Sequence, residues 1–382
     1  QLRGALMIRL SSLIERFEAD YLATYGDGVL PSQRKALSAL KTCRTSAAPV
    51  MQARCEACDH VEVVPHSCGH RSCPHCQHHE SQRWIERQLA RQVPADYFLL
   101  TFTLPASLRA LAWANQRTLY DLMTRCAWET LRTFARNDPQ LQGEAGAIAV
   151  LHTHSRRLDY HPHVHVVMPA AAIEAERRRW RTKRRNKRSA GKGAYLFSHK
   201  ALAKVFRGKL LAAVTGAALA LPPSYPKDWV VDCKHVGSGA KALVYLGRYL
   251  YRGVIREQDI LACENGQVTF RYRHAKRNRW EQRTLPGAQF LALVLRHVLP
   301  KGFRRARNFG FLHPNSKRSI TLLHYLFGMV VKRTPADEKP RPQLRCRCCG
   351  ATMRITAVGL PPRPRRDGAP PLPLLSAEAA VM

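Results

Sequence analysis

The stretch YHPHVHVVMP, Tyr160–Pro169, places three histidines in five positions directly before an apolar run. Successive side chains of a β-strand point to opposite faces. His161, His163 and His165 therefore share one face, and the intervening valines point into a core. Because proline cannot donate to a strand ladder, Pro162 restricts the regular strand to the residues that follow it. The pattern predicts a rigid strand that presents imidazoles to one point.

The most direct use of such a strand is to bind a metal ion. Imidazole suits several divalent ions, and two imidazoles leave coordination positions open for catalysis. We interpret His163 and His165 as a metal-binding pair. His161 is a candidate third ligand, and Asp159 has the same parity. The alternative is a half-exposed strand that uses histidine at its surface.

The composition indicates a nucleic-acid partner. The chain has 382 residues, enough for two or three domains, and carries 62 Lys+Arg against 27 Asp+Glu, a net charge of +35. Such an excess attracts a polyanion, as in a ribosomal or histone-like binder. No apolar run is long enough to span a membrane, no secretory signal is apparent, and no basic amphipathic helix favours a membrane surface. We expect a protein of the cytoplasm.

Hydrophobic periodicity predicts a mixed α and β chain. Helices are expected at 5–42, 80–93, 106–137, 198–220, 238–252 and 286–299, and strands at 97–103, 147–152 and 161–168. A strand pair at 258–273 is joined by Asn265 and Gly266, a strong hairpin signal. The segment 177–192 has ten basic residues in sixteen and no acid, so we expect an unpacked loop or arm. The Pro- and Arg-rich end, 356–382, is expected to be disordered.

The cysteines predict structural zinc. CEAC (Cys55, Cys58) and CPHC (Cys73, Cys76) are two knuckles with fourteen residues between them, a spacing typical of one tetrahedral Zn²⁺ site. Such a site is closed to chemistry. Other side chains of the same segment could replace a cysteine or form a second site, although we favour polar loop roles for the histidines; they are His66, Cys68, His70 and His75.

Paired cysteines in a large basic chain indicate thiols and metal ligands in a reducing compartment. A further knuckle near the C-terminus, Cys346 to Cys349, is half of a metal site or no site at all. Cys126, Cys233 and Cys263 stand alone and are expected to be small core residues.

The stretch KALVYLGRYLYR supplies candidate nucleophiles. On a helix, Tyr245 and Tyr249 lie one turn apart on one face, flanked by Arg248 and Arg252. Tyrosine can attack phosphorus when a metal ion polarises the phosphate, and arginine suits phosphate binding. The alternative is an amphipathic helix with tyrosines at the boundary of the core.

His163-Val164-His165 followed by a tyrosine pair on a helix resembles the HUH endonucleases, and among them the rolling-circle transposases of the insertion-sequence ninety-one family. The likeness extends from about residue 35 to residue 350. It is carried by CRT (43–45), SCPHCQ, TFTLP (101–105), HPHVHVVMP, YLFSHKALAKVFRGKLLAA, YLGRYLYR, VTFRYR (268–273) and HVLPKGFRRARNFGFL (297–312).

The resemblance implies an α+β fold, a ferredoxin-like HUH core with a central antiparallel sheet, preceded by a small zinc-ribbon-like domain and a helical N-terminus. It implies nicking of single-stranded DNA at element ends through a 5′-phosphotyrosine intermediate, with catalytic Mg²⁺ or Mn²⁺ and structural Zn²⁺. His163 and His165 match the metal-binding pair, and Tyr245 and Tyr249 match the tyrosine motif. Arg184, Arg185, Lys187 and Arg188 of the basic segment, with the arginines beside the tyrosines, are expected to grip DNA; Trp180 would stack on bases or anchor the loop.

We expect four consecutive parts: a helical segment at 1–42, a zinc-binding domain at 43–92, a nuclease domain at 93–335 with an insertion at 177–192, and a cysteine knuckle with a disordered tail at 336–382. Three alternatives stay open. One is a replication initiator or relaxase with the same covalent chemistry. Another is a zinc-ribbon DNA-binding protein without catalysis, such as a decayed transposase. The last is a metallohydrolase that cuts with water.

Overall fold

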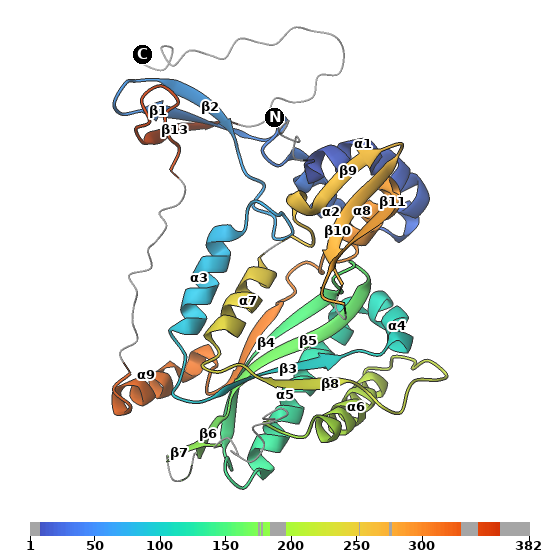
Figure 1. Cartoon of the computed structure of the whole chain (residues 1–382), viewed down its shortest axis with the longest axis vertical. Helices are drawn as coiled ribbons and strands as arrows, with labels where there is room; N and C mark the ends of the chain where they lie inside the picture. The colour runs from blue at the N-terminus through green and yellow to red at the C-terminus, as the bar shows by residue number, and fades with distance from the viewer. Residues whose placement is uncertain are drawn as a thin grey trace. The chain divides into compact units, whose positions relative to one another are not determined.

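The computed structural model describes residues 8–174, 176, 179–183, 196–251, 253–274, 277–329 and 343–359. The chain forms two compact units, drawn in Figure 1. The large unit comprises Gln1–Lys41 and Gly69–Pro342, and the small unit comprises Thr42–Cys68 and Gln343–Met382. This division differs from the four consecutive parts expected from the sequence, because a C-terminal strand pairs with the strand Val50–Cys55. No helix within the described ranges is long and apolar enough to cross a membrane.

The large unit is built on a seven-stranded antiparallel sheet. The strand order is β7-β6-β4-β5-β3-β8, and β12 also pairs with β4. The strands are β3 (Tyr97–Thr103), β4 (Glu144–His154), β5 (Tyr160–Pro169), β6 (Ala171–Glu174), β7 (Arg179–Thr182), β8 (Val231–His235) and β12 (Ala306–Gly310). The predicted strands at 97–103, 147–152 and 161–168 are therefore confirmed, and they are the adjacent central strands.

Helices cover both faces of this sheet. The first layer contains α5 (Gln116–Asn137) and α6 (His199–Gly216), whose apolar side chains pack with Val164 and Val166 of β5. The second layer contains α3 (His78–Leu89) and α7 (Ala240–Leu250), packed on Val150 and Val167. Figure 1 shows α3 and α7 side by side.

Gly247 sets how closely α7 approaches α3. A Cβ at this position would lie 2.3 Å from Cγ1 of Ile85. The Ser81 hydroxyl of α3 also donates to the Gly247 carbonyl at 3.0 Å. Helix α3, for which the sequence predicted a helix at 80–93, is therefore part of the core, because its apolar side, with Trp84 and Ile85, is buried against α7.

A smaller layer of the large unit combines the N-terminal helices with residues 260–295. It contains α1 (Leu10–Tyr25), α2 (Pro31–Thr42), α8 (Gly287–Leu295) and the sheet β11-β10-β9, formed by β9 (Ile260–Glu264), β10 (Gln267–Arg273) and β11 (Trp280–Pro286). Asn265 and Gly266 have φ of 48° and 74°, as the predicted hairpin turn requires. The remaining helices are α4 (Arg109–Ala114) and α9 (Lys317–Leu326).

The small unit is a three-stranded antiparallel sheet of order β13-β1-β2. Its strands are β1 (Val50–Cys55), β2 (Val61–Pro65) and β13 (Met353–Gly359). Its buried core consists of Ala53, Cys55, Cys346 and Met353. The expectation of disorder from residue 356 is wrong for 356–359, which pair with β1; the rest of that tail lies outside the described residues.

The basic segment differs in part from the expected free arm. Arg179–Thr182 forms β7, which pairs with β6. Trp180 packs on Phe311 and Phe327, with ring centroids at 5.5 and 6.3 Å. Trp180 therefore anchors the segment, since its ring is engaged with other aromatic side chains. The DNA-gripping candidates Arg184, Arg185, Lys187 and Arg188 lie outside the described residues.

Candidate active site and metal centres

Three histidines from two adjacent strands converge on the face of the sheet that α7 covers. The register of β4 and β5 places His152 opposite His163 and Val150 opposite His165. One ring nitrogen from each of His152, His163 and His165 lies within 4.8 Å of the others. Three imidazoles at this separation are a ligand set that a divalent ion could accept.

Hydrogen bonds fix the orientation of two of these rings. Nδ1 of His163 bonds the backbone carbonyl oxygen of His161 at 2.6 Å. Nδ1 of His165 bonds the Thr101 hydroxyl on the neighbouring strand β3 at 3.0 Å. A partner on Nδ1 leaves Nε2 to face a metal ion, which is how protein metal sites commonly orient histidine. Nε2 of His152 is buried and has no hydrogen-bond partner among the described residues, as expected of a ligand atom.

Burial keeps these imidazoles neutral. Desolvation lowers the pKa of His163 to about 4 and that of His165 to about 3. Desolvation, reinforced by the neighbouring His165 and His163, lowers the pKa of His152 well below its ordinary value. Neutral imidazole is the form that binds metal, so the site is ready for an ion at neutral pH.

The third histidine of the group is His152, in place of the expected His161. The His161 ring is turned to Arg109, whose guanidinium donates to its Nδ1 at 2.7 Å. Asp159, the other candidate, is paired with Arg283 at 2.9 Å. Strand parity correctly placed His161 on the same face as His163 and His165. Its ring nitrogens nevertheless lie outside the group that His152, His163 and His165 form. A signal for His152 was present, since it ends the strand predicted at 147–152.

We call His152, His163 and His165 the histidine triad. If these three residues are the metal ligands, His152 should contribute more to metal affinity than His161. His152→Ala is expected to weaken Mn²⁺ binding by at least about 100-fold, beyond the 10- to 100-fold typical of losing an outer-shell partner. His161→Ala should leave the affinity nearly unchanged, because only the His161 backbone carbonyl holds His163. Calorimetric titration of each folded variant measures this. A large loss in His161→Ala with none in His152→Ala would contradict the assignment.

The two candidate tyrosines of α7 have different environments. The side chain of Tyr245 is 50% exposed, and its ring centroid lies 6.3 Å from those of His152 and His165. The Tyr249 ring stacks on His152, with an interplanar angle of 10°, and its hydroxyl is buried. Burial raises the pKa of Tyr249, although Arg305 opposes this. Tyr245 is therefore open to solvent beside the histidines, whereas the hydroxyl of Tyr249 is buried and its ring packs on His152.

Arg305 ties α7 to the histidine strand. Its guanidinium carbon lies 4.5 Å from the Tyr249 ring centroid. It donates to the Leu151 carbonyl of β4 at 3.1 Å and to the Leu250 carbonyl at the end of α7 at 3.2 Å. Arg305 was not singled out from the sequence, where it is one arginine among several. Of the arginines that were, Arg248 is exposed on α7 and Arg252 lies outside the described residues.

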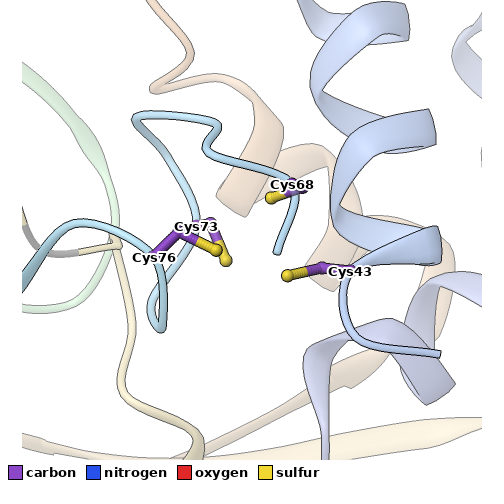
Figure 2. Close-up of side chains that lie close together, drawn as sticks. All are labelled: Cys43, Cys68, Cys73 and Cys76. Carbon is purple, nitrogen blue, oxygen red and sulfur yellow. The ribbon is translucent and has the colours of Figure 1, made fainter. Parts of the chain in front are cut away.

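Two groups of four cysteines replace the expected single group. Figure 2 shows Cys43, Cys68, Cys73 and Cys76 with their sulfur atoms turned toward one another. Their four Sγ atoms lie within 4.8 Å of one another. The knuckle Cys73–Cys76 thus meets two cysteines that stand singly in the sequence.

The second group lies entirely in the small unit and consists of Cys55, Cys58, Cys346 and Cys349. Sγ of Cys55 is 3.4 Å from that of Cys349, and Sγ of Cys58 is 3.6 Å from that of Cys346. The backbone N–H of Ala57 is the largest influence on Cys55 and lowers the pKa of its thiol to about 7. Amide donors that stabilise thiolate, and four sulfur atoms at this separation, fit a closed Zn²⁺ site.

The sequence spacing therefore identified both knuckles but paired them wrongly. The Cys55–Cys58 knuckle meets the C-terminal knuckle because β13 pairs with β1, and Cys346 is part of a complete group of four. Cys126 and Cys233 are buried core residues, as expected, whereas Cys263 is only partly buried.

Sequence comparisons agree with this combination of sites. Residues 146–319 match the family described as "Putative transposase", and residues 13–104 match the family described as "Transposase zinc-binding domain". "Putative transposase y4qJ" of Sinorhizobium fredii (strain NBRC 101917 / NGR234) is 30% identical over 356 residues, which are 85% of this chain and 87% of the relative. "Transposase for insertion sequence element IS801" of Pseudomonas savastanoi pv. phaseolicola is 29% identical over 367 residues, 87% and 85% of the two chains.

Among solved structures, the conjugative relaxase TrwC in complex with mutant OriT DNA is similar at 15% identity, over 60% of this chain and 74% of that chain. Its TM-score is 0.25, so the assignment rests on the sequence relatives. The matched regions contain the cysteines from Cys43 to Cys76, all three histidines of the site and the tyrosine helix, whereas Cys346 and Cys349 lie beyond them. The chain belongs to the insertion-sequence ninety-one family of transposases and carries that family's zinc-binding domain in its N-terminal part.

Proposed function

We propose that this transposase nicks single-stranded DNA at the ends of its element by attack of the Tyr245 hydroxyl on a phosphodiester. The observation that carries the proposal is a solvent-accessible tyrosine beside three neutral histidines. A nucleophile and a cation site close together are what a phosphoryl transfer needs, because catalysis is then mainly positioning and charge stabilisation.

The step forms a bond between Tyr245 oxygen and phosphorus and breaks the bond between phosphorus and the 3′ oxygen. The products are a 5′-phosphotyrosine and a free 3′-OH; the tyrosine proton leaves to solvent and the departing oxygen takes one up. A divalent ion on His152, His163 and His165, Mg²⁺ or Mn²⁺, would draw charge from a non-bridging phosphate oxygen. The phosphodiester to tyrosine conserves the bond energy, so rejoining to a new 3′-OH, as rolling-circle transposition requires, needs no ATP.

Tyr249 takes a different part in this proposal. Its hydroxyl is buried, and its ring stacks on His152 and contacts the Arg305 guanidinium, so in this conformation it is not placed to attack a phosphate. We therefore assign the first attack to Tyr245. Tyr249 supports the His152 ring in this conformation, and it becomes a second nucleophile only if α7 shifts and releases it from Arg305.

Single-stranded DNA is the proposed substrate on electrostatic grounds. The net charge of +35 supplies a sequence-independent grip on phosphates. Exposed Arg248 lies three residues after Tyr245 on α7 and is available for phosphate. Unpaired strands bring their phosphates and bases to such a surface without the cost of opening a duplex.

The proposal is tested by trapping the covalent intermediate. Purified protein with Mn²⁺ and end-labelled single strands from the element's own termini is expected to give a slow, protease-sensitive band on a denaturing gel. Omitting Mn²⁺ should remove the band. Cleavage without the band would favour hydrolysis by water, and binding with neither band nor cleavage would favour a DNA-binding protein without catalysis.

A further inference from the structure

A cavity of about 680 Å³ opens in the large unit at the start of the histidine strand. Its walls come from α1 and the turn after it, α4, the first residues of β5, β11 and α8. The volume is in the range of small-molecule and cofactor sites, which is 300–1,000 Å³ or so. Neither the three grouped histidines nor Tyr245 and Tyr249 line it, so it is separate from them.

The charge in this cavity favours an anion. Three arginines line it, Arg109, Arg283 and Arg296, against one carboxylate, Asp159. Arg283 is neutralised by Asp159 at 2.9 Å. Arg109 and Arg296 take part in no ion pair within the described ranges of the chain, and Nε of Arg109 is buried without a hydrogen-bond partner there. Two uncompensated guanidiniums at one cavity are suited to a phosphate group.

The other walls favour a planar aromatic ring. Trp113 and Tyr160 line the cavity and meet edge to face, with ring centroids 5.5 Å apart. Tyr160 is fixed by a 2.6 Å hydrogen bond between its hydroxyl and that of Tyr120. Arg296 lies over Trp113, its guanidinium carbon 5.8 Å from the ring centroid. Rigid aromatic side chains with arginine beside them are the usual surface on which unpaired bases stack.

The cavity is joined to the metal-binding histidines by two hydrogen bonds. Arg109 lines the cavity and donates to His161 at 2.7 Å, and the carbonyl of His161 bonds Nδ1 of His163 at 2.6 Å. His161 and His163 are two residues apart on β5, which corresponds to about 7 Å along a strand. One extended nucleotide can bridge that distance. Arg109 and His161 therefore connect this cavity to His163, beside which the cut phosphate is proposed to lie.

We infer that this cavity binds one unstacked nucleotide of the single-stranded substrate, adjacent to the phosphodiester that is cut. The base lies against Trp113 and Tyr160, and the phosphate is held by Arg109 and Arg296. The inference rests on the proposed function, because the neighbouring phosphate is the one assigned to Tyr245. A base held in the cavity fixes which phosphodiester lies beside His152, His163 and His165, and so determines which bond is cut.

The inference is tested by combining removal of one base from the DNA with substitution of Trp113 in the cavity wall. Single strands of the element terminus, each with one abasic position, are titrated against full-length protein in buffer without Mg²⁺ or Mn²⁺, so that binding is measured without cleavage. One position next to the cut is expected to weaken wild-type binding about 10-fold or more, as for the loss of a stacked base. In the Trp113→Leu variant, an abasic site at this position should weaken binding little further.

Trp280→Leu is the matched control. Trp280 is an exposed tryptophan that also lies beside an arginine, Arg271, at 5.0 Å, but it does not line the cavity. In this variant, the abasic position should weaken binding as much as it does in the wild type. If the penalty in Trp113→Leu equals that in Trp280→Leu at every position, the inference is overturned.

A second variant guards against misfolding of Trp113→Leu. Arg296→Gln is expected to lower the slope of log Kd against log salt by about 0.7, the value for one phosphate contact on a single strand. An unchanged slope would overturn the phosphate assignment. A covalent adduct without abasic coupling would refute the cavity alone, and coupling without an adduct would refute the proposed chemistry alone.

Discussion

Tyr245→Phe is expected to abolish the covalent protein–DNA band and to lower nicking on the order of 10³-fold or more, as when other enzymes lose their nucleophile. The variant lacks the attacking oxygen but keeps the ring, and the 50% exposure of Tyr245 indicates little effect on packing. Binding of single-stranded DNA in buffer without Mn²⁺ should be unchanged. The measurement is the rate of adduct formation with Mn²⁺ under single-turnover conditions.

Two tyrosines of the same helix end provide matched comparisons for Tyr245→Phe. Tyr249→Phe keeps the stack on His152 and the contact with Arg305, so it should still form the first adduct. Tyr251→Phe removes a half-buried hydroxyl outside the histidine site and should behave as wild type. If Tyr249→Phe lost the adduct and Tyr245→Phe retained it, the order of the two tyrosines would be reversed.

Zinc content is expected to be two ions per chain, and Cys346→Ser with Cys349→Ser should reduce it to one. Structural zinc contributes an apparent binding free energy of about 10–16 kcal/mol in small domains, which is folding free energy. The small unit buries few apolar side chains, so it should unfold without its metal. Elemental analysis gives the stoichiometry, and limited proteolysis reports the loss of the unit.

Cys348→Ser is the internal control for the zinc experiment, because Cys348 lies in the same knuckle but outside the group of four. It should leave two ions bound. Substituting Cys43 and Cys68 should remove the other ion. A single ion that depends on Cys55 and Cys73 together, and is indifferent to Cys346, would restore the pairing expected from the sequence.

The sequence predicted those features that depend on neighbouring residues. Alternation along 161–168 gave the correct strand and its histidine face, because the two faces of a strand follow from backbone geometry. The Asn265–Gly266 turn was confirmed because few residue pairs accept positive φ. The helix at 238–252 placed Tyr245 and Tyr249 one turn apart, although nothing local showed that only one of them reaches solvent.

The membership of each metal group was decided by the tertiary structure. His152 joins His163 through the register of two strands, and a one-residue slip would have placed it on the opposite face. Cys55 meets Cys349 across 294 residues because β13 pairs with β1. A knuckle shows that two thiols lie on one side of a metal ion, but the residues that complete the group come from distant strands. The sequence therefore determined the ligand types and the local pairs, and long-range strand pairing determined which pairs share an ion.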